Sequence, residues 1–156
     1  MKVEIRLLQE SDAYTSYMWR NDPDVFKYTG NVYENIITLE TELEWIRRVI
    51  KNENEYRCAI LADGEYVGNI YLTDITEASA EYHIFLGNKN FWGKGIAKKA
   101  SLLILEYAFD VLNLKNIYLK VRKENKSAVL LYNSLGFREE ENDGIWSLMK
   151  KSNIDF

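Results

Sequence analysis

The residues best suited to do chemistry lie in a short glycine-containing turn, Gly93-Lys94-Gly95, between an apolar strand and an amphipathic helix. Because glycine has no Cβ, the main chain can adopt positive φ there and a ligand can approach the amides closely. The first amides of the following helix have no partner within that helix, and its dipole is positive at this end. The sequence therefore predicts a binding site for a phosphate group.

Two familiar phosphate-binding motifs do not fit this turn. A P-loop has four residues between its first glycine and its Gly-Lys-Ser/Thr, whereas five residues separate Gly87 from Gly93, and Lys94 is followed by Gly95. A dinucleotide fingerprint that began at Gly93 would need a third glycine where Lys98 stands. Both motifs are therefore excluded.

A third motif fits. The hexapeptide Asn90-Phe-Trp-Gly-Lys-Gly95 resembles the (Gln/Arg)-x-x-Gly-x-(Gly/Ala) signature of the GNAT acyltransferases, with Asn90 where the family usually has Gln or Arg. A second block, residues 115–137, resembles the strand, helix and Leu-Gly-Phe turn that close a GNAT domain. The resemblance covers nearly the whole chain and is closest to the branch of ribosomal-protein, polyamine and amino-sugar N-acetyltransferases.

The resemblance implies one GNAT domain over residues 1–156, of class α/β (α+β). Its mixed, mostly antiparallel seven-stranded sheet would be flanked by four helices and splayed between the fourth and fifth strands. Acetyl-CoA, the implied co-substrate, would lie in that gap. The residues that the resemblance implies for its binding are Ile84, Phe85, Leu86, Asn90, Gly93, Lys94, Gly95, Ile96, Ala97, Asn125, Ser127 and Tyr132.

Catalytic roles follow from the same resemblance. Tyr132 matches the family tyrosine that protonates the leaving thiolate, and a phenol of pKa ~10 is protonated at neutral pH; by periodicity alone it would be a core residue. Glu81 matches a glutamate near the acceptor site and is the first candidate for the base. His83, two residues further on the same strand face, is the second candidate, and bulk water is the alternative to both.

The segment Trp19-Arg20-Asn21 resembles the end of the first helix in amino-sugar and ribosomal-protein acetyltransferases. In that interpretation Trp19 stacks on a sugar or base and Arg20 pairs with a phosphate; packing on the second helix is the alternative.

The expected activity is transfer of acetyl to a primary amine by direct attack in a ternary complex. We expect a nucleotide-linked amino sugar as the acceptor, then a polyamine, then a protein N-terminal amine. A non-catalytic acyl-CoA-binding sensor is the alternative from another class.

The composition and charge of the chain limit the kinds of partner that it is expected to bind. The formal charge of −4 gives no electrostatic reason to coat nucleic acid, and no apolar stretch approaches the length of a membrane span. A single cysteine and a single histidine exclude a cysteine-based zinc site and a multi-histidine centre, so no metal is expected. We expect a cytoplasmic monomer or homodimer that acts on a small-molecule amine.

Hydrophobic periodicity and turn residues predict the elements that position these groups. Residues 24–37 form an irregular connection of a length that often carries binding residues. Trp45, Tyr56, Tyr71 and Trp92 are expected to be packing residues. Strands are expected at 3–8, 57–61, 65–72, 79–86, 116–121, 137–141 and 145–150, and helices at 11–20, 38–51, 96–111 and 125–135.

Overall fold

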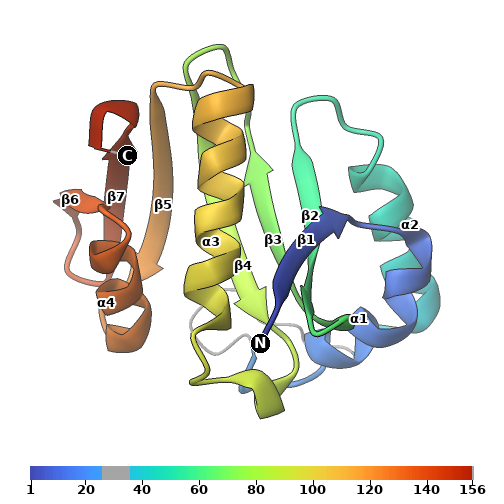
Figure 1. Cartoon of the computed structure of the whole chain (residues 1–156). Helices are drawn as coiled ribbons and strands as arrows, with labels where there is room; N and C mark the ends of the chain where they lie inside the picture. The colour runs from blue at the N-terminus through green and yellow to red at the C-terminus, as the bar shows by residue number, and fades with distance from the viewer. Residues whose placement is uncertain (26–35, 156) are drawn as a thin grey trace.

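The computed structural model describes residues 1–25 and 36–155, whose strands form one seven-stranded sheet (Figure 1). Its strand order is β1-β2-β3-β4-β5-β7-β6, and every neighbouring pair is antiparallel except β4 and β5. The expected mixed, mostly antiparallel sheet is confirmed. The strands are β1 (Val3–Leu7), β2 (Tyr56–Ala62), β3 (Glu65–Thr73), β4 (Ser79–Leu86), β5 (Asn116–Arg122), β6 (Arg138–Asn142) and β7 (Trp146–Ser152).

The four expected helices are α1 (Ala13–Arg20), α2 (Leu39–Val49), α3 (Ile96–Glu106) and α4 (Lys126–Ser134). Side-chain caps set two of their starts: Thr38 Oγ1 accepts from the Thr41 amide at 3.1 Å, and Asn125 Oδ1 accepts from the Ala128 amide at 3.4 Å. In residues 1–25 and 36–155, no helix has both the length and the apolarity needed to cross a bilayer. Most of the expected connection at 24–37 lies outside the described residues.

The end of α3 differs from the expected regular helix. Residues 107–111 form a π-helical turn, in which the Leu112 amide donates to the Tyr107 carbonyl at 3.0 Å. Ala108 and Phe109 in this turn are buried at 0% and 2% exposure, and they continue the buried pairs Ala100–Ser101 and Ile104–Leu105 of the regular helix. Val111, at the end of this wider turn, is 61% exposed.

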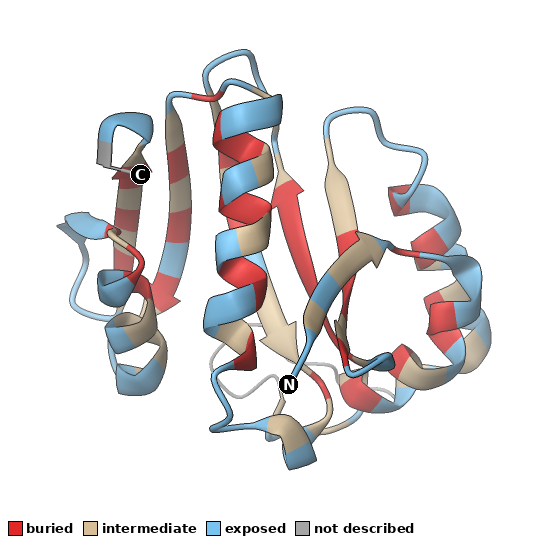
Figure 2. Cartoon of the chain, in the orientation of Figure 1, coloured by how far each residue is buried: buried red, intermediate tan, exposed pale blue. Residues whose placement is uncertain are grey.

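Helices cover both faces of the sheet. Along β2, Cys58 and Ile60 belong to the main core, which includes residues of α3 and α4, whereas Ala59 between them belongs to a smaller core with residues of α1 and α2. Successive side chains of a strand point to opposite faces, so α3 and α4 lie on one face and α1 and α2 on the other. Figure 2 shows the resulting stripe of buried residues on α3, between exposed ones.

The sheet splays between its two parallel strands. β4 pairs with β5 only where Ser79–Glu81 lies beside Asn116–Tyr118, yet β4 continues to Leu86 and β5 to Arg122. The expected splay is confirmed, and it leaves the end of β4 unpaired on the side of β5. At the other end of the order, β6 forms an edge of the sheet, and all five of its residues are exposed.

Candidate active site

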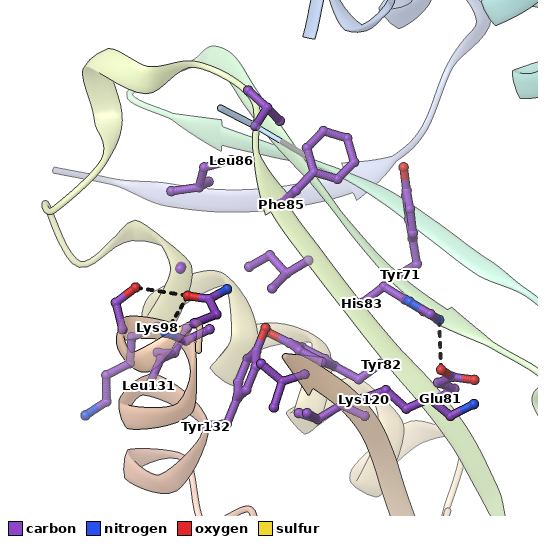
Figure 3. Close-up of a pocket in the computed structure, with 18 of the residues that line it drawn as sticks. Tyr71, Glu81, Tyr82, His83, Phe85, Leu86, Lys98, Lys120, Leu131 and Tyr132 are labelled. Atoms are coloured by element: carbon purple, nitrogen blue, oxygen red, sulfur yellow. Dashed lines mark hydrogen bonds and ion pairs between the residues drawn. The ribbon is translucent and has the colours of Figure 1, made fainter. Parts of the chain in front are cut away.

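A cavity of about 1140 Å³ follows this splay. Its helix end is lined by the start of α3 and by α4, including Gly93, Gly95, Ile96, Ala97, Lys98, Asn125, Ser127, Leu131 and Tyr132. Its strand end is lined by residues of α1, α2 and β2 to β4, including Arg20, Trp45, Glu55, Arg57, Tyr71, Thr73, Asp74, Glu81 and His83. Ile84, Phe85 and Leu86 of β4 lie between the two ends (Figure 3).

The glycine turn at the helix end presents main-chain donors. Gly93 and Gly95 have φ of 74° and 77°, in the left-handed region that favours glycine, and a Cβ on either would meet nothing within 4 Å. Among the described residues, no main-chain carbonyl accepts from the amides of residues 93–97. Those amides are therefore available to an anion, and the N-terminus of α3 adds its dipole.

Two residues that the resemblance assigns to cofactor binding do not line the cavity. Lys94 places its ammonium 5.4 Å from the centroid of the Phe91 ring. The Asn90 amide donates to the side chain of Asn88 at 3.1 Å, inside the turn that precedes α3. The indole of Trp92, expected to be a packing residue, lines the cavity and is 43% exposed.

Tyr132 reaches the helix end of the cavity from α4 (Figure 3). Its side chain is 9% exposed, and its ring lies edge to face with those of Tyr82 and Phe137. Burial raises the pKa of Tyr132 to about 12, so the phenol keeps its proton at neutral pH. Next to it, the Ser127 hydroxyl donates to the Asn125 side chain at 3.3 Å at the start of α4.

Glu81 and His83 lie side by side on β4 at the strand end (Figure 3). The Glu81 Oε1 and His83 Nε2 atoms are 3.8 Å apart, and Nε2 is 2.9 Å from Thr73 Oγ1. Burial lowers the pKa of His83 more than the nearby carboxylate raises it, so the imidazole is neutral at pH 7. The structure thus brings both candidate bases to the same cavity as Tyr132.

The strand end also contains residues that sequence patterns did not select. The Arg57 guanidinium lies 4.2 Å from the Tyr71 ring centroid and 5.1 Å from that of Trp45, and it pairs with Glu55. Asp74 follows β3 at the rim. The signal that could have found Arg57 is its position opposite Tyr71, which in turn lies opposite His83, but this signal requires the strand register. Asp74 lies beyond the end of β3, where strand alternation gives no signal.

Of the three residues expected to bind the acceptor, only Arg20 lines the cavity. Its Nε atom lies 2.8 and 2.7 Å from the two carboxylate oxygens of buried Glu42. Trp19 is 8% exposed and packs on Tyr66 at a centroid distance of 4.7 Å. The Asn21 side chain bonds the main chain of Tyr17 and Ile37, which fixes the end of α1 beside the start of α2.

Comparisons with known proteins agree with this geometry. Residues 2–138 match the family model "Acetyltransferase (GNAT) domain". A spermidine N(1)-acetyltransferase of Escherichia coli is 33% identical over 141 residues, which cover 88% of this chain and 74% of that protein. The acetyltransferase PseH of Campylobacter jejuni is 26% identical over 147 residues, covering 93% and 90%.

Among solved structures, a Vibrio cholerae spermidine N-acetyltransferase in complex with CoA and spermine superposes with a TM-score of 0.88 at 27% identity, covering 98% of this chain and 96% of that one. The similarity covers both the fold and the sequence of most of the chain. The chain therefore belongs to the GNAT family and is an acetyl-CoA-dependent N-acetyltransferase.

Proposed function

We propose that this enzyme acetylates a linear polyamine of the spermidine type. The carrying observation is the charge at the strand end of the cavity: within the described residues, neither Asp74 nor Glu81 forms an ion pair with an arginine or lysine. Arg20 and Arg57 each pair with a carboxylate, Glu42 and Glu55. Lys98 and Lys120 also line the cavity, but within the described residues neither forms an ion pair with Asp74 or Glu81, so these two carboxylates can attract the ammonium groups of an acceptor.

Relatives give independent support. Curated relatives from two species carry the name spermidine N(1)-acetyltransferase, and one solved neighbour contains spermine. The sequence favoured a nucleotide-linked amino sugar, with Arg20 as the phosphate partner. That acceptor is now the second candidate, because a guanidinium held by a buried carboxylate is a weaker phosphate site.

In the proposed reaction, the amides of residues 93–97 hold the diphosphate of acetyl-CoA. The Glu81–His83 pair takes the proton of the attacking ammonium, either directly or through water. The neutral amine then forms a bond to the thioester carbonyl, while main-chain N–H groups on the unpaired side of β4 stabilise the oxyanion. As the carbon–sulfur bond breaks, Tyr132 protonates the leaving thiolate, and the second proton of the attacking nitrogen passes through water to the tyrosinate, which leaves free CoA, an N-acetylamine and a protonated Tyr132.

A thiol-release assay with acetyl-CoA tests the acceptor. Spermidine, spermine and putrescine are compared with a nucleotide-linked amino sugar and with a peptide carrying a free N-terminus. We expect kcat/KM for spermidine to exceed that for the amino sugar by at least about tenfold, equivalent to 1.4 kcal/mol. Preference for the sugar would overturn the polyamine assignment, and acetyl-CoA binding with no turnover on any amine would favour the sensor.

A further inference from the structure

Two hydroxyl side chains, Tyr82 and Ser101, are buried together between β4 and α3, and Tyr82 also lines the catalytic cavity. Tyr82 points to the face of the sheet opposite Glu81 and His83 and is 2% exposed, and Ser101 is 0% exposed. The Tyr82 hydroxyl oxygen lies 2.5 Å from Ser101 Oγ. Ser101 Oγ in turn donates to the Ala97 carbonyl at 2.6 Å. Because Ser101 has one proton, Tyr82 is the donor of the pair, and the chain runs from Tyr82 through Ser101 to Ala97.

The other side of the Tyr82 ring contacts the proposed acid. The rings of Tyr82 and Tyr132 have centroids 5.7 Å apart and planes at 85°, which is an edge-to-face contact. Both rings also pack on Phe137, at 5.8 and 6.1 Å. Figure 3 shows the Tyr82 and Tyr132 rings next to each other at the wall of the cavity.

This arrangement connects the diphosphate site with the position expected for the thioester sulfur. Ala97 belongs to the first turn of α3, whose amides are available to the diphosphate. Tyr132 lies where the sulfur is expected. A chain of two hydrogen bonds and one ring contact therefore sets the position of the acid relative to the diphosphate site.

Packing alone does not account for the two hydroxyl groups. A phenylalanine at 82 and an alanine at 101 would fill nearly the same volume, and replacing both partners of a buried hydrogen bond by apolar groups is often close to neutral for stability. What the hydrogen bond adds is a fixed direction for the Tyr82 ring. A difference of about 1 Å in the placement of a catalytic group can change a rate substantially.

We propose that Tyr82 is a positioning residue for Tyr132. Its hydrogen bond to Ser101 fixes the Tyr82 ring, and this ring holds the Tyr132 hydroxyl at the thioester sulfur when the diphosphate is bound at the start of α3. This inference rests on the proposed role of Tyr132 as the proton donor. Tyr82 itself transfers no proton in the reaction.

A double-mutant cycle in the full chain tests the proposal, because two residues that act as a unit give non-additive effects. We compare wild type, Tyr82→Phe, Ser101→Ala, Tyr132→Phe and the two doubles that include Tyr132→Phe. With saturating spermidine, Tyr82→Phe and Ser101→Ala should each lower kcat about tenfold, the size expected for losing about one hydrogen bond. The KM for acetyl-CoA should stay within about twofold.

In the Tyr132→Phe background, neither change should lower kcat further. A matched control is Tyr56→Phe, which alters a half-buried tyrosine stacked on Tyr107 at 4.0 Å, away from the cavity. It should leave kcat unchanged. Thermal unfolding of every variant separates loss of folding from loss of rate.

The outcomes that overturn the proposal are distinct from those that overturn the function. Wild-type kcat in Tyr82→Phe, or an equal loss with and without the Tyr132 hydroxyl, would show that Tyr82 does not act through Tyr132. Wild-type turnover in Tyr132→Phe alone would instead remove the assigned acid, and the positioning role with it. Absence of turnover in the wild-type enzyme on every amine would reject the proposed function itself.

Discussion

The indole N–H of Trp92 donates to the main-chain carbonyl of Leu86 at 2.8 Å. This bond connects the glycine turn to the end of β4 and occupies the main-chain carbonyl of a residue that the resemblance assigns to acetyl-CoA binding. Ile84, which the resemblance also assigns to acetyl-CoA binding, lines the cavity two residues earlier on β4.

The bond between Trp92 and Leu86 predicts an effect on affinity. Trp92→Phe keeps an aromatic ring but removes the N–H, so the turn should lose part of its fixed position. We expect acetyl-CoA to bind about two- to tenfold more weakly, as for loss of 0.5–1.5 kcal/mol. Calorimetric titration with acetyl-CoA measures this, and an unchanged Kd would show that the bond does not support the site.

Gly95 should matter for binding as well as for stability. Its φ of +77° strains any side chain, although a Cβ there would meet nothing within 4 Å. Gly95→Ala should therefore lose about 1–2 kcal/mol of unfolding free energy and also bind acetyl-CoA more weakly. Gly64→Ala, at φ +85° in the β2–β3 turn and equally open, is the matched control for the strain. Equal affinities in the two variants would contradict a role for the turn.

Removing the hydroxyl group of Tyr132 should slow the chemical step. Tyr132→Phe keeps the ring contacts with Tyr82 and Phe137 but leaves no proton for the thiolate. We expect kcat to fall by about 10²–10⁴, the usual contribution of a general acid, with acetyl-CoA affinity nearly unchanged. Single-turnover kinetics provide the test, and a variant that loses affinity but keeps its rate would argue for a binding role.

The two carboxylates at the strand end should select cationic acceptors. Asp74→Asn and Glu81→Gln should each raise the KM for spermidine, and the wild-type KM should rise with salt because charge attraction is screened. Glu77→Gln changes an exposed carboxylate in the β3–β4 turn that does not line the cavity, and it should have no effect. Acceptor kinetics at two ionic strengths check this. A similar KM in all three variants would reject the proposed subsite.

The acid limb of the pH–rate profile should report His83. Burial lowers its pKa from 6.5, and the charged groups that act on it are Glu81, Arg57, Asp74 and Glu55. Below that lowered pKa the imidazole is protonated, cannot accept a proton and repels the acceptor ammonium, so the rate falls as pH falls. The limb should therefore lie below pH 6.5, and His83→Gln should remove or move it. An unchanged limb in the variant would assign the titration to another group.

Local patterns predicted the sheet and the main elements of the site. They did not predict the register between β2 and β3, which brings together the residues at the strand end of the cavity. The Asp63-Gly64 turn places Ala62 opposite Glu65, and an uninterrupted ladder from there would put Arg57 opposite Ile70. A bulge near Ile60 and Leu61 shifts the register, so Arg57 lies opposite Tyr71 instead. A shift of one residue exchanges the two faces of a strand, and so the sequence did not reveal that Tyr71 lines the cavity.

The packing of Trp19 was also not predicted, because it depends on a contact between residues far apart in the sequence. A Cβ on Gly87 would lie 1.9 Å from the Trp19 ring, so this glycine makes the space that the indole fills. The two residues are far apart in sequence, and no local pattern joins them. The glycine turn and Tyr132, by contrast, belong to local motifs whose neighbouring residues determine their geometry, so the sequence could propose both as site residues, and both line the cavity.

The composition of the edge strand β6 has a consequence for how copies of this protein meet. An uncovered strand offers main-chain groups on which a further strand could be templated, the first step towards cross-β aggregation. Here that edge carries Glu139, Glu140 and Glu141 in succession, all exposed. Two such edges repel each other, so pairing of two copies through their β6 edges is disfavoured.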